Sequence, residues 1–485
     1  MEIVFVTAEI TPFSKVGGLA DVSSALPKAL RTLGHRVLVI SPLYRGIPTD
    51  RYSLARRLSR IDVALGRTTH AVEVWDGRLP SGVDVCFVGC PGLLDRDVYG
   101  EPGGAPYPDN HLRFTLLCRA ALEICRLRER PVDIFHAHEW TTALVPLFLK
   151  HLYAGDRRIG NARSVFTIHN LAYQGLYDRV VMEEAGIPAS TFTPEGIEFY
   201  GKANLLKAGI VYSEQITTVS PTYARQILGP EHGHGLEGLL ATRRDALTGI
   251  LNGIDYSVWN PATDPALPAR YDAEDAGGKV RCKAELQREV GLPVRPDVPL
   301  AGIVSRLVEQ KGFDLFGEVA TRVLRQDMQL VVLGSGDPSL RAMFEDLARR
   351  FPDRVALRSG YDEALSHRIY GGCDLYLMPS RFEPSGLTQM YAMRYGVIPV
   401  VRHTGGLADS VVDCDASGES GTGFVFDEFE PSALLGAIER ALALYRDPPA
   451  FAGLVRRAMR VDHSWDRSAR MYDQIYQELV ATNEP

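Results

Sequence analysis

The sequence has no cysteines at CxxC spacing, no long apolar run and no excess of positive charge. Two of its seven cysteines, Cys86 and Cys90, lie four residues apart but have no matching second pair. We therefore expect buried free thiols instead of disulfides or a zinc site. No stretch could span a membrane, and the first residues lack the basic region of a signal peptide. These absences predict a cytoplasmic protein that does not bind a membrane.

The charge of the chain limits its partners. Its formal net charge of -7 argues against a nucleic-acid-binding protein. It also implies that any anionic ligand is held by a few local cations, because the protein as a whole does not attract anions.

The chain is long enough for two domains. Its 485 residues exceed the roughly 250–300 residues that one hydrophobic core supports. Short apolar runs rich in β-branched residues alternate with helical patterns, as in parallel sheets built from βαβ units. We expect strands at EIVFVTA, RVLVISP, VDVCFVG, DIFHAH, SVFTIHN and QITTVSP, and then at PLAGIVS, QLVVLGSG, VALRSG, DLYLMPS, IPVVRH and GFVFD. Residues 260–278, rich in Pro, Asp and Gly, are expected to form a linker or an extended loop.

The sequence thus predicts an α/β protein with two doubly wound, Rossmann-like domains, residues 1–248 and 249–462. Ligands of open α/β sheets bind at the carboxyl ends of the strands. Two such domains facing each other would enclose a central cleft, and there we expect the functional residues.

The first candidate motif is KVGGLADV, which follows the first expected strand. Gly17 and Gly18 let the backbone approach a ligand closely, and the N–H groups of the following helix start, with Lys15 beside them, could bind a diphosphate. A tight turn with a solvated lysine is an equally good interpretation of this stretch alone. The pentapeptide GGLAD returns at residues 405–409.

Two histidine-containing stretches also end expected strands. HAHEW begins at His136 and TIHN contains His169. His136 and His138 share one face of a strand but have no evident third ligand, which disfavours a metal site. An acceptor-sugar site fits better, with Glu139 and His169 binding hydroxyls and Trp140 offering a ring face. Histidines satisfied within the core are the alternative.

Two stretches in the second half of the chain contain further candidate ligand-binding residues. Arg306 and Lys311 flank one strand-to-helix turn, which suits a diphosphate, although solvated surface cations would look the same. The stretch MPSRFEPSGLTQMYAMRYG places Glu383 before a helix expected to begin at residues 385–388. Glu383 would face the neutral sugar of a sugar nucleotide and favour the positive charge that develops as the glycosidic bond breaks, or it would merely cap the helix.

An Asp-x-Asp pattern at Asp413 and Asp415 lies in the loop CDASGESGTG. Solvated turn residues are the default there, so we predict no obligatory metal.

Taken together, these motifs resemble those of bacterial glycogen synthases and plant starch synthases. These enzymes are retaining glycosyltransferases of the GT-B fold, which extend an α-1,4-glucan from ADP-glucose. The resemblance covers nearly the whole chain. It rests on AEITPFSKVGGLADV, YPDNHLRF, HAHEW, TIHNLAYQG, LNGIDYSVWNP, SRLVEQKG, SGYDEALSHRIYGGCDLYLMPSRFEPSGLTQMYAMRYG and PVVRHTGGLADSV.

The resemblance implies a set of donor-binding residues drawn from both domains. These are Lys15, Gly17, Gly18, Asn252, Arg306, Lys311, Tyr361, Glu383, Ser385, Gly386, Leu387 and Thr388. Lys15, Arg306 and Lys311 would stabilise the leaving diphosphate, and Glu383 would contact the transferred glucose, with His169 beside the reacting carbon. Tyr361 would lie near the nucleotide base.

The resemblance has further implications. Glu139 and Trp140 would bind the acceptor glucan, and residues 463–485 would form a helical segment that returns to the first domain. ADP-glucose would be a substrate, so no cofactor is expected. Of the two GGLAD copies, we expect the first to lie at the donor site and the second, preceded by His403 and Thr404, to line its edge.

Three positions depart from the family's usual residues. Val16 replaces a threonine, Glu139 an aspartate, and Ser385 a cysteine that is frequent in bacterial relatives. Tyr391, as in glycogen synthases, stands where other related retaining families carry a second glutamate, which puts ribose recognition by a carboxylate there in doubt.

Other activities stay open from the sequence. Another GT-B enzyme, such as a UDP-sugar-using synthase or a sugar-nucleotide epimerase, would share most of these motifs. A silent glucan-binding protein would not need paired anion sites.

Overall fold

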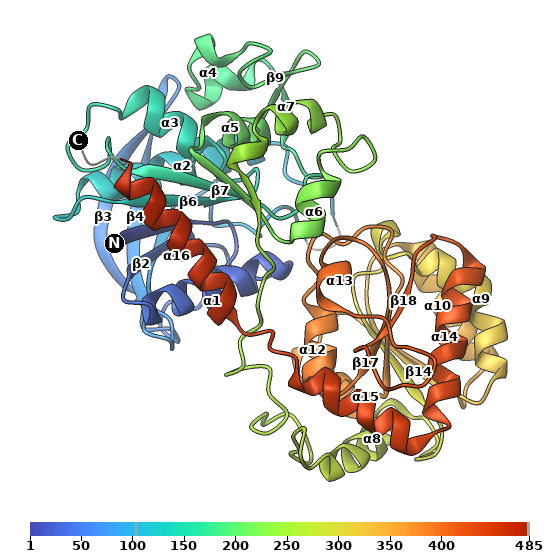
Figure 1. Ribbon diagram of the computed structural model, residues 1–485. Coiled ribbons are helices and arrows are strands. Elements are labelled where there is room, and N and C mark those ends of the chain that lie inside the picture. The colour runs from blue at the N-terminus through green and yellow to red at the C-terminus, as the bar shows by residue number, and fades with distance from the viewer. Residues whose placement is uncertain (102–103, 483–485) are drawn as a thin grey trace. The chain divides into compact units, whose positions relative to one another are not determined.

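The computed structural model describes residues 1–101 and 104–482, and the chain divides into two compact units. Unit 1 comprises residues 1–252 together with the C-terminal segment from Trp465, and unit 2 comprises residues 253–464. Both are α/β units with a mainly or wholly parallel sheet covered by helices (Figure 1). No helix among the described residues is long and apolar enough to cross a membrane.

Unit 1 is built on a nine-stranded sheet of order β12-β11-β7-β6-β1-β2-β5-β4-β3. Its strands are β1 (Glu2–Val6), β2 (Arg36–Pro42), β3 (Ala55–Leu65), β4 (Thr68–Arg78), β5 (Asp84–Gly89), β6 (Ile134–His138), β7 (Arg163–Ile168), β11 (Gln215–Thr218) and β12 (Leu247–Gly249). All pairings are parallel except those that β4 makes with β3 and β5. A small separate sheet consists of β8 (Leu176–Asp178), β9 (Glu198–Phe199) and β10 (Lys202–Asn204).

Both faces of this sheet are buried, which explains the continuous apolar runs of its parallel strands. Alternate residues of β1 enter different cores: Val4 and Val6 one, Ile3 and Phe5 the other. The helices of unit 1 are α1 (Gly18–Thr32), α2 (Asn110–Arg126), α3 (Leu144–Leu152), α4 (Val181–Ala185), α5 (Leu205–Tyr212), α6 (Pro221–Gln226), α7 (Glu237–Thr242) and α16 (Trp465–Ala481).

Helix α16 lies far from the other helices of unit 1 in sequence but packs beside α1 (Figure 1). Its Trp465, Tyr472 and Tyr476 belong to the same core as Ile3 and Phe5. The last helix thus completes the covering of one face of the unit 1 sheet.

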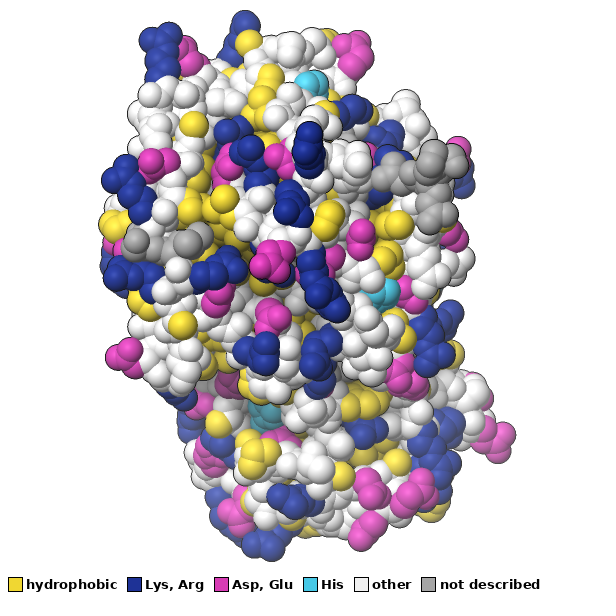
Figure 2. Space-filling view, turned by 90° about the vertical axis from the view of Figure 1, so that its left-hand side faces the viewer, with side chains coloured by type: hydrophobic (Ala, Val, Ile, Leu, Met, Phe, Trp, Pro, Cys, Tyr) yellow, Lys and Arg dark blue, Asp and Glu magenta, His cyan; other side chains and the backbone are white. Residues whose placement is uncertain are grey.

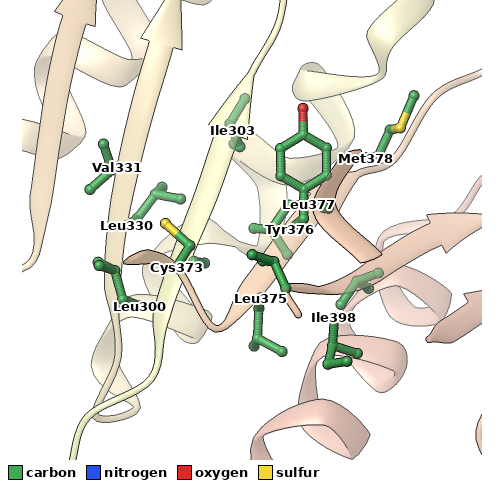
Figure 3. Packing of buried hydrophobic residues seen from close by; sticks show 14 of the residues in the cluster. Leu300, Ile303, Leu330, Val331, Cys373, Leu375, Tyr376, Leu377, Met378 and Ile398 are labelled. Carbon is green, nitrogen blue, oxygen red and sulfur yellow. The ribbon is translucent and has the colours of Figure 1, made fainter. Parts of the chain in front are cut away.

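Unit 2 contains a six-stranded parallel sheet of order β15-β14-β13-β16-β17-β18. Its strands are β13 (Leu300–Val304), β14 (Gln329–Gly334), β15 (Val355–Ser359), β16 (Leu375–Met378), β17 (Ile398–Arg402) and β18 (Phe424–Phe426). The main helices are α8 (Gly277–Val290), α9 (Phe313–Arg325), α10 (Pro338–Arg350), α11 (Glu363–Gly372), α12 (Thr388–Arg394), α13 (Gly405–Ser410), α14 (Pro431–Tyr445) and α15 (Pro448–Arg460). The buried side chains of its central strands, among them Leu300, Leu330 and Leu375, belong to one hydrophobic core cluster (Figure 3).

The twelve strands expected from the sequence are all present, and this confirms the α/β class with two doubly wound units. The sequence analysis missed the hairpin β3–β4, the short strand β12 and the small sheet of β8, β9 and β10. Residues 260–276 contain neither helix nor strand, but Leu267 and Tyr271 are buried in the core of unit 2, so this loop is a packed part of that unit. All seven cysteines are free and buried, as predicted.

The charged side chains on the face shown in Figure 2 are mixed. Lys and Arg side chains lie interspersed with Asp and Glu side chains, and no broad area of this face carries one sign of charge.

Candidate active site

Several candidate residues follow the strands at which each sheet changes direction. In unit 2 the chain proceeds from β13 outward to β15 and then returns to β16, so β13 and β16 are neighbours that lead in opposite directions. In unit 1, β1 and β6 have the same relationship. Loops separate at such a switch point and leave room for a ligand at the carboxyl ends of the strands.

In unit 2 the switch point brings Lys311 and Glu383 together. Lys311 lies at the end of the short 3-10 helix η3 (Glu309–Lys311), after β13, and Glu383 follows β16. The ammonium Nζ of Lys311 donates to Oε2 of Glu383 at 2.6 Å, and the hydroxyl of Ser380 donates to the same oxygen at 3.1 Å. Both side chains are largely buried, with 17% and 8% of their surface exposed. The carboxylate is therefore oriented and paired before any ligand arrives.

Gly312 allows the Lys311 turn to lie close to the loop that carries Glu383. Its φ of +68° is in the left-handed region, and a Cβ atom there would lie 2.0 Å from the carbonyl oxygen of Pro379. A larger residue would push the Lys311 turn away from the loop that carries Glu383.

Arg306 and Tyr361 also follow strands of unit 2 but are exposed. Arg306 comes two residues after β13, and Tyr361 comes two residues after β15 with 65% of its surface accessible. An exposed tyrosine ring at the carboxyl edge of a sheet is available for stacking on a planar ligand.

The loop after Glu383 differs in detail from the sequence-based expectation. Helix α12 begins at Thr388, with Leu387 as its N-cap, so Pro384 and Ser385 precede the helix instead of forming its first turn. Gly386 adopts a φ of +67°. The hydroxyl oxygen of Ser385 is buried and has no hydrogen-bond partner among the described residues. A ligand group reaching this loop would satisfy that hydroxyl.

The second GGLAD copy packs against the backbone of the loop that contains Glu383 and Ser385. A Cβ atom at Gly405 would lie 2.0 Å from the carbonyl oxygen of Glu383, and one at Gly406 would lie 2.0 Å from that of Ser385. The amide of Gly406 donates to the Glu383 carbonyl at 3.0 Å. The paired glycines of this copy allow two backbone segments to touch, and His403 is half exposed beside Asp427.

The first GGLAD copy, in unit 1, has different surroundings. A Cβ atom at Gly17 would meet nothing within 4 Å, and no side chain caps helix α1. Nζ of Lys15 donates to Oδ1 of Asp21, in the same pentapeptide, at 2.8 Å, with a quarter of the lysine side chain exposed. The space beside Gly17 suits the close approach of a ligand.

The buried carboxylate of Glu9 occupies two backbone amides directly before α1. It accepts from the amides of Val16 at 2.6 Å and Gly17 at 2.9 Å, and the Tyr99 hydroxyl donates to its other oxygen at 2.7 Å. The carboxylate holds the loop in place, which leaves the helix start itself and Lys15 to face an anion. The sequence analysis missed Glu9. The one signal for it was an acidic residue directly after a fully apolar strand.

Glu139 is placed at the end of β6 with a φ of +68°. Its Oε1 accepts from the backbone amides of His169 at 2.5 Å and Asn170 at 2.8 Å. Burial raises the pKa of this carboxyl from 4.5 to about 7, although the amide hydrogen bonds oppose the shift. Glu139 thus fixes the backbone of the loop that carries His169.

His169 is part of a buried polar cluster. Its Nε2 lies 3.0 Å from Nδ1 of His138, and the ring of His138 lies 4.1 Å from that of His136. The Tyr476 hydroxyl of helix α16 is 2.7 Å from Nδ1 of His136. Burial lowers the pKa of His169 to about 3, so its imidazole is neutral at pH 7. His136, with Thr167 and Tyr476 as partners of its two ring nitrogens, is a satisfied core histidine, the alternative that the sequence left open. His138 is buried too, but its Nε2 has no hydrogen-bond partner among the described residues.

Trp140 and Asn252 complete the unit 1 candidates. The indole of Trp140 packs edge-on against Phe114 and lies against the backbone of Gly175, where a Cβ atom would be 2.5 Å away. It is partly buried, so some of the ring stays accessible. Asn252 is 5% exposed, and its Oδ1 has no hydrogen-bond partner among the described residues.

Comparison with known proteins decides the family. Residues 2–242 match the family model of the starch synthase catalytic domain, and residues 288–452 match that of glycosyl transferases group 1. The chain is 50% identical to a glycogen synthase of Anaeromyxobacter dehalogenans strain 2CP-1 and 44% identical to glycogen synthase 2 of Geobacter sulfurreducens, over 99% of each chain. The chain belongs to the glycogen and starch synthase family.

A solved structure supports the family assignment. The catalytic domain of starch synthase IV from Arabidopsis thaliana, bound to ADP and acarbose, has a TM-score of 0.93 and 37% identity, with 99% of both chains covered. Sucrose-phosphate synthase from Thermosynechococcus elongatus is 19% identical with a TM-score of 0.61, a likeness of fold alone. This member of the glycogen and starch synthase family has the GT-B fold and is a hexosyltransferase.

Two features of this family member are clarified by the structure. Tyr391, at the place of the second glutamate of related families, is buried, and Trp259 stacks on it at 3.9 Å and on His367 at 4.0 Å. That position therefore contributes to the core of unit 2.

The Asp-x-Asp pattern of this family member is part of a turn. Asp413 pairs with Arg440 at 2.9 Å, and Asp415 accepts from the hydroxyls of Ser417 and Ser420. No group of three or more potential ligands, here or elsewhere in residues 1–101 and 104–482, is arranged to hold a metal ion.

Proposed function

We propose that the protein is a glycogen synthase that transfers glucose from ADP-glucose to the non-reducing 4-hydroxyl of an α-1,4-glucan with retention of configuration. The observation that carries the proposal is the near-complete coverage of relatives that are named glycogen synthases and of a starch synthase bound to ADP and acarbose. ADP-glucose is a substrate here, and the proposed reaction needs neither a cofactor nor a metal. The cytoplasmic location is part of the same proposal.

The residues around Glu383 suit the chemistry of glycosyl transfer. Cleavage of the bond between glucose and ADP leaves positive charge on the sugar and negative charge on the diphosphate. The oriented carboxylate of Glu383 stabilises the sugar, while Lys311 and Arg306 stabilise the diphosphate. Pairing of Lys311 with Glu383 keeps the two charges in a fixed arrangement, so little reorganisation is needed in the transition state.

The unit 1 residues have complementary roles in the proposal. Lys15, Gly17 and Gly18 bind the same donor, and Asn252 offers its unsatisfied amide oxygen to a donor hydroxyl. The neutral imidazole of His169 hydrogen-bonds a hydroxyl near the reacting carbon without adding charge. Trp140 contacts the acceptor, and Glu139 holds the His169 loop.

Retention follows if the acceptor hydroxyl attacks from the face that ADP leaves. The new glycosidic bond forms to the acceptor oxygen as the bond to ADP breaks, and the leaving phosphate takes the acceptor proton. Positioning and electrostatics then provide the catalysis, and no covalent intermediate is required.

Transfer of radiolabel from ADP-glucose into glycogen tests the proposal, with UDP-glucose as the parallel donor. We expect label in glycogen from ADP-glucose at a rate at least about tenfold above that from UDP-glucose. The reverse preference would assign a UDP-sugar-using synthase. Conversion of ADP-glucose in the absence of glucan would indicate an epimerase, and failure with both donors would refute glucosyl transfer to glycogen.

A further inference from the structure

Unit 2 contains a cavity of about 700 Å3 at the edge of its sheet opposite the candidate donor residues. Pro299 and Asp374 line the cavity and directly precede β13 and β16. Arg306, Lys311 and Glu383 follow the same two strands. The cavity therefore lies a full strand length from the candidate active site, and its volume is typical of sites for small organic molecules.

The cavity has an excess of positive charge. Three of its four carboxylates are paired at 2.7 Å: Asp374 with Lys283, Asp327 with Arg295, and Glu274 with Arg460. The cavity cations Lys279, Arg446 and Arg456 make no ion pair with any residue that the structure describes. They face only one further carboxylate, that of Asp297. An anion is the ligand that balances these charges.

Lys279 is the cation best placed to bind such a ligand. Its Nζ donates to the carbonyl oxygens of Gly371 at 3.2 Å and Tyr395 at 3.0 Å, at the ends of helices α11 and α12. An ammonium has three N–H donors, so one is left for a ligand. Burial lowers the pKa of Lys279 to about 8, and the nearby Asp374 carboxylate, which is paired with Lys283, opposes this shift only in part.

The rest of the cavity wall is largely apolar. Helix α14 contributes Leu442, and helix α15 contributes Phe451, Val455 and Met459. These side chains also pack in the core of unit 2, and a small inorganic anion would leave their cavity-facing surface uncovered, whereas an organic anion with an apolar body would cover it.

We propose that this cavity is a binding site for a small organic anion with an apolar body, whose charged group pairs with Lys279 and whose body lies against helices α14 and α15. The site is separate from the candidate donor site and does not depend on the proposed function.

Two fluorescent probes with the same apolar framework test the site. 8-Anilinonaphthalene-1-sulfonate carries a sulfonate, and N-phenyl-1-naphthylamine does not. We expect the full-length protein to bind the sulfonate at one site at least about tenfold more tightly than the neutral probe, because a hydrogen bond to a charged group favours the anion. Equal affinity for the two probes would overturn the proposal, as would displacement of the sulfonate by ADP.

Variants locate the bound probe. Lys279→Met should weaken the sulfonate about tenfold and change binding of the neutral probe less than twofold. The double change Arg446→Gln and Arg456→Gln removes two exposed cations of the cavity without disturbing the core, and should weaken the sulfonate at least threefold. Arg281→Gln, on the exposed side of helix α8 and outside the cavity, is the matched control and should have no effect.

A filling variant gives an independent measurement. Ala452 lines the cavity from an exposed position on α15, so Ala452→Trp should fold normally and reduce binding of both probes at least tenfold. Unchanged sulfonate affinity in this variant and in the double arginine variant would refute the assignment, even if Lys279→Met failed to fold.

Discussion

The ammonium of Lys311 lies 2.6 Å from Oε2 of Glu383, although the two residues are 72 positions apart in the sequence. The contact joins the loops that follow β13 and β16, the two strands at which the unit 2 sheet changes direction. Ser380 donates to the same carboxylate oxygen. A carboxylate held in this way resembles a preorganised electrostatic group more than a helix cap.

Replacing Glu383 by Ala should lower kcat more than about a hundredfold and change KM for ADP-glucose little. The carboxylate is expected to act on charge that exists only in the transition state, so its loss affects the chemical step more than ground-state binding. Steady-state transfer to glycogen measures both constants. Ser380→Ala, which removes only the second hydrogen bond to the carboxylate, should cost less than tenfold. Near-normal turnover of the alanine variant at position 383 would refute the assignment.

Lys15→Ala should reduce kcat/KM for ADP-glucose far more than His403→Ala, by at least about tenfold, although both residues precede a GGLAD sequence. Both side chains lie beside a carboxylate, Lys15 beside Asp21 and His403 beside Asp427, but Lys15 carries a permanent charge next to the open space at Gly17, whereas His403 is half exposed. Parallel kinetic measurements on the two variants test this difference. Equal losses would mean that the two copies have equivalent roles.

Replacing a glycine by alanine should lower stability in the second GGLAD copy, whereas in the first copy it should affect donor binding. Gly406→Ala would place a Cβ atom 2.0 Å from the Ser385 carbonyl oxygen, so the melting temperature should fall by at least about 4 °C. Gly17→Ala meets nothing within 4 Å and should leave the melting temperature unchanged while it raises KM for ADP-glucose. Calorimetry and kinetics on both variants check the prediction, and equal melting temperatures would contradict it.

Stability should depend on pH through Glu139. Its pKa is raised from 4.5 to about 7 in the folded protein, so the folded state binds more protons than the unfolded state between these values. Relative to Glu139→Gln, the wild-type protein should therefore lose about 3 kcal/mol of stability in total as the pH rises from about 4.5 through the folded pKa of about 7, with the loss complete by about pH 8. Urea unfolding of both proteins at several pH values measures the difference. Parallel stability curves would show that the carboxyl is not shifted.

The sequence by itself determined the twelve parallel strands and the types of residue that follow them. Strands buried on both faces must be continuously apolar, so Ile3 to Val6 and Leu300 to Val304 could be recognised from local composition. The hairpin β3–β4 was not predicted, for two reasons. Charged residues such as Arg56, Arg57 and Asp76 interrupt its apolar residues, and register shifts disturb the alternation of apolar and polar side chains. The same local information gave the resemblance that the full-length comparisons then confirmed.

Only the tertiary structure decided which of these residues meet. The order of strands places Lys311 against Glu383, directs the Glu9 carboxylate to the amides of Val16 and Gly17, and sets the second GGLAD copy behind the Glu383 loop. Each contact joins groups whose separation along the chain carries no information about their distance in space. The pentapeptide is the same in both units, but its surroundings differ: Gly405 and Gly406 pack against the backbone of the Glu383 loop, whereas Gly17 lies beside open space.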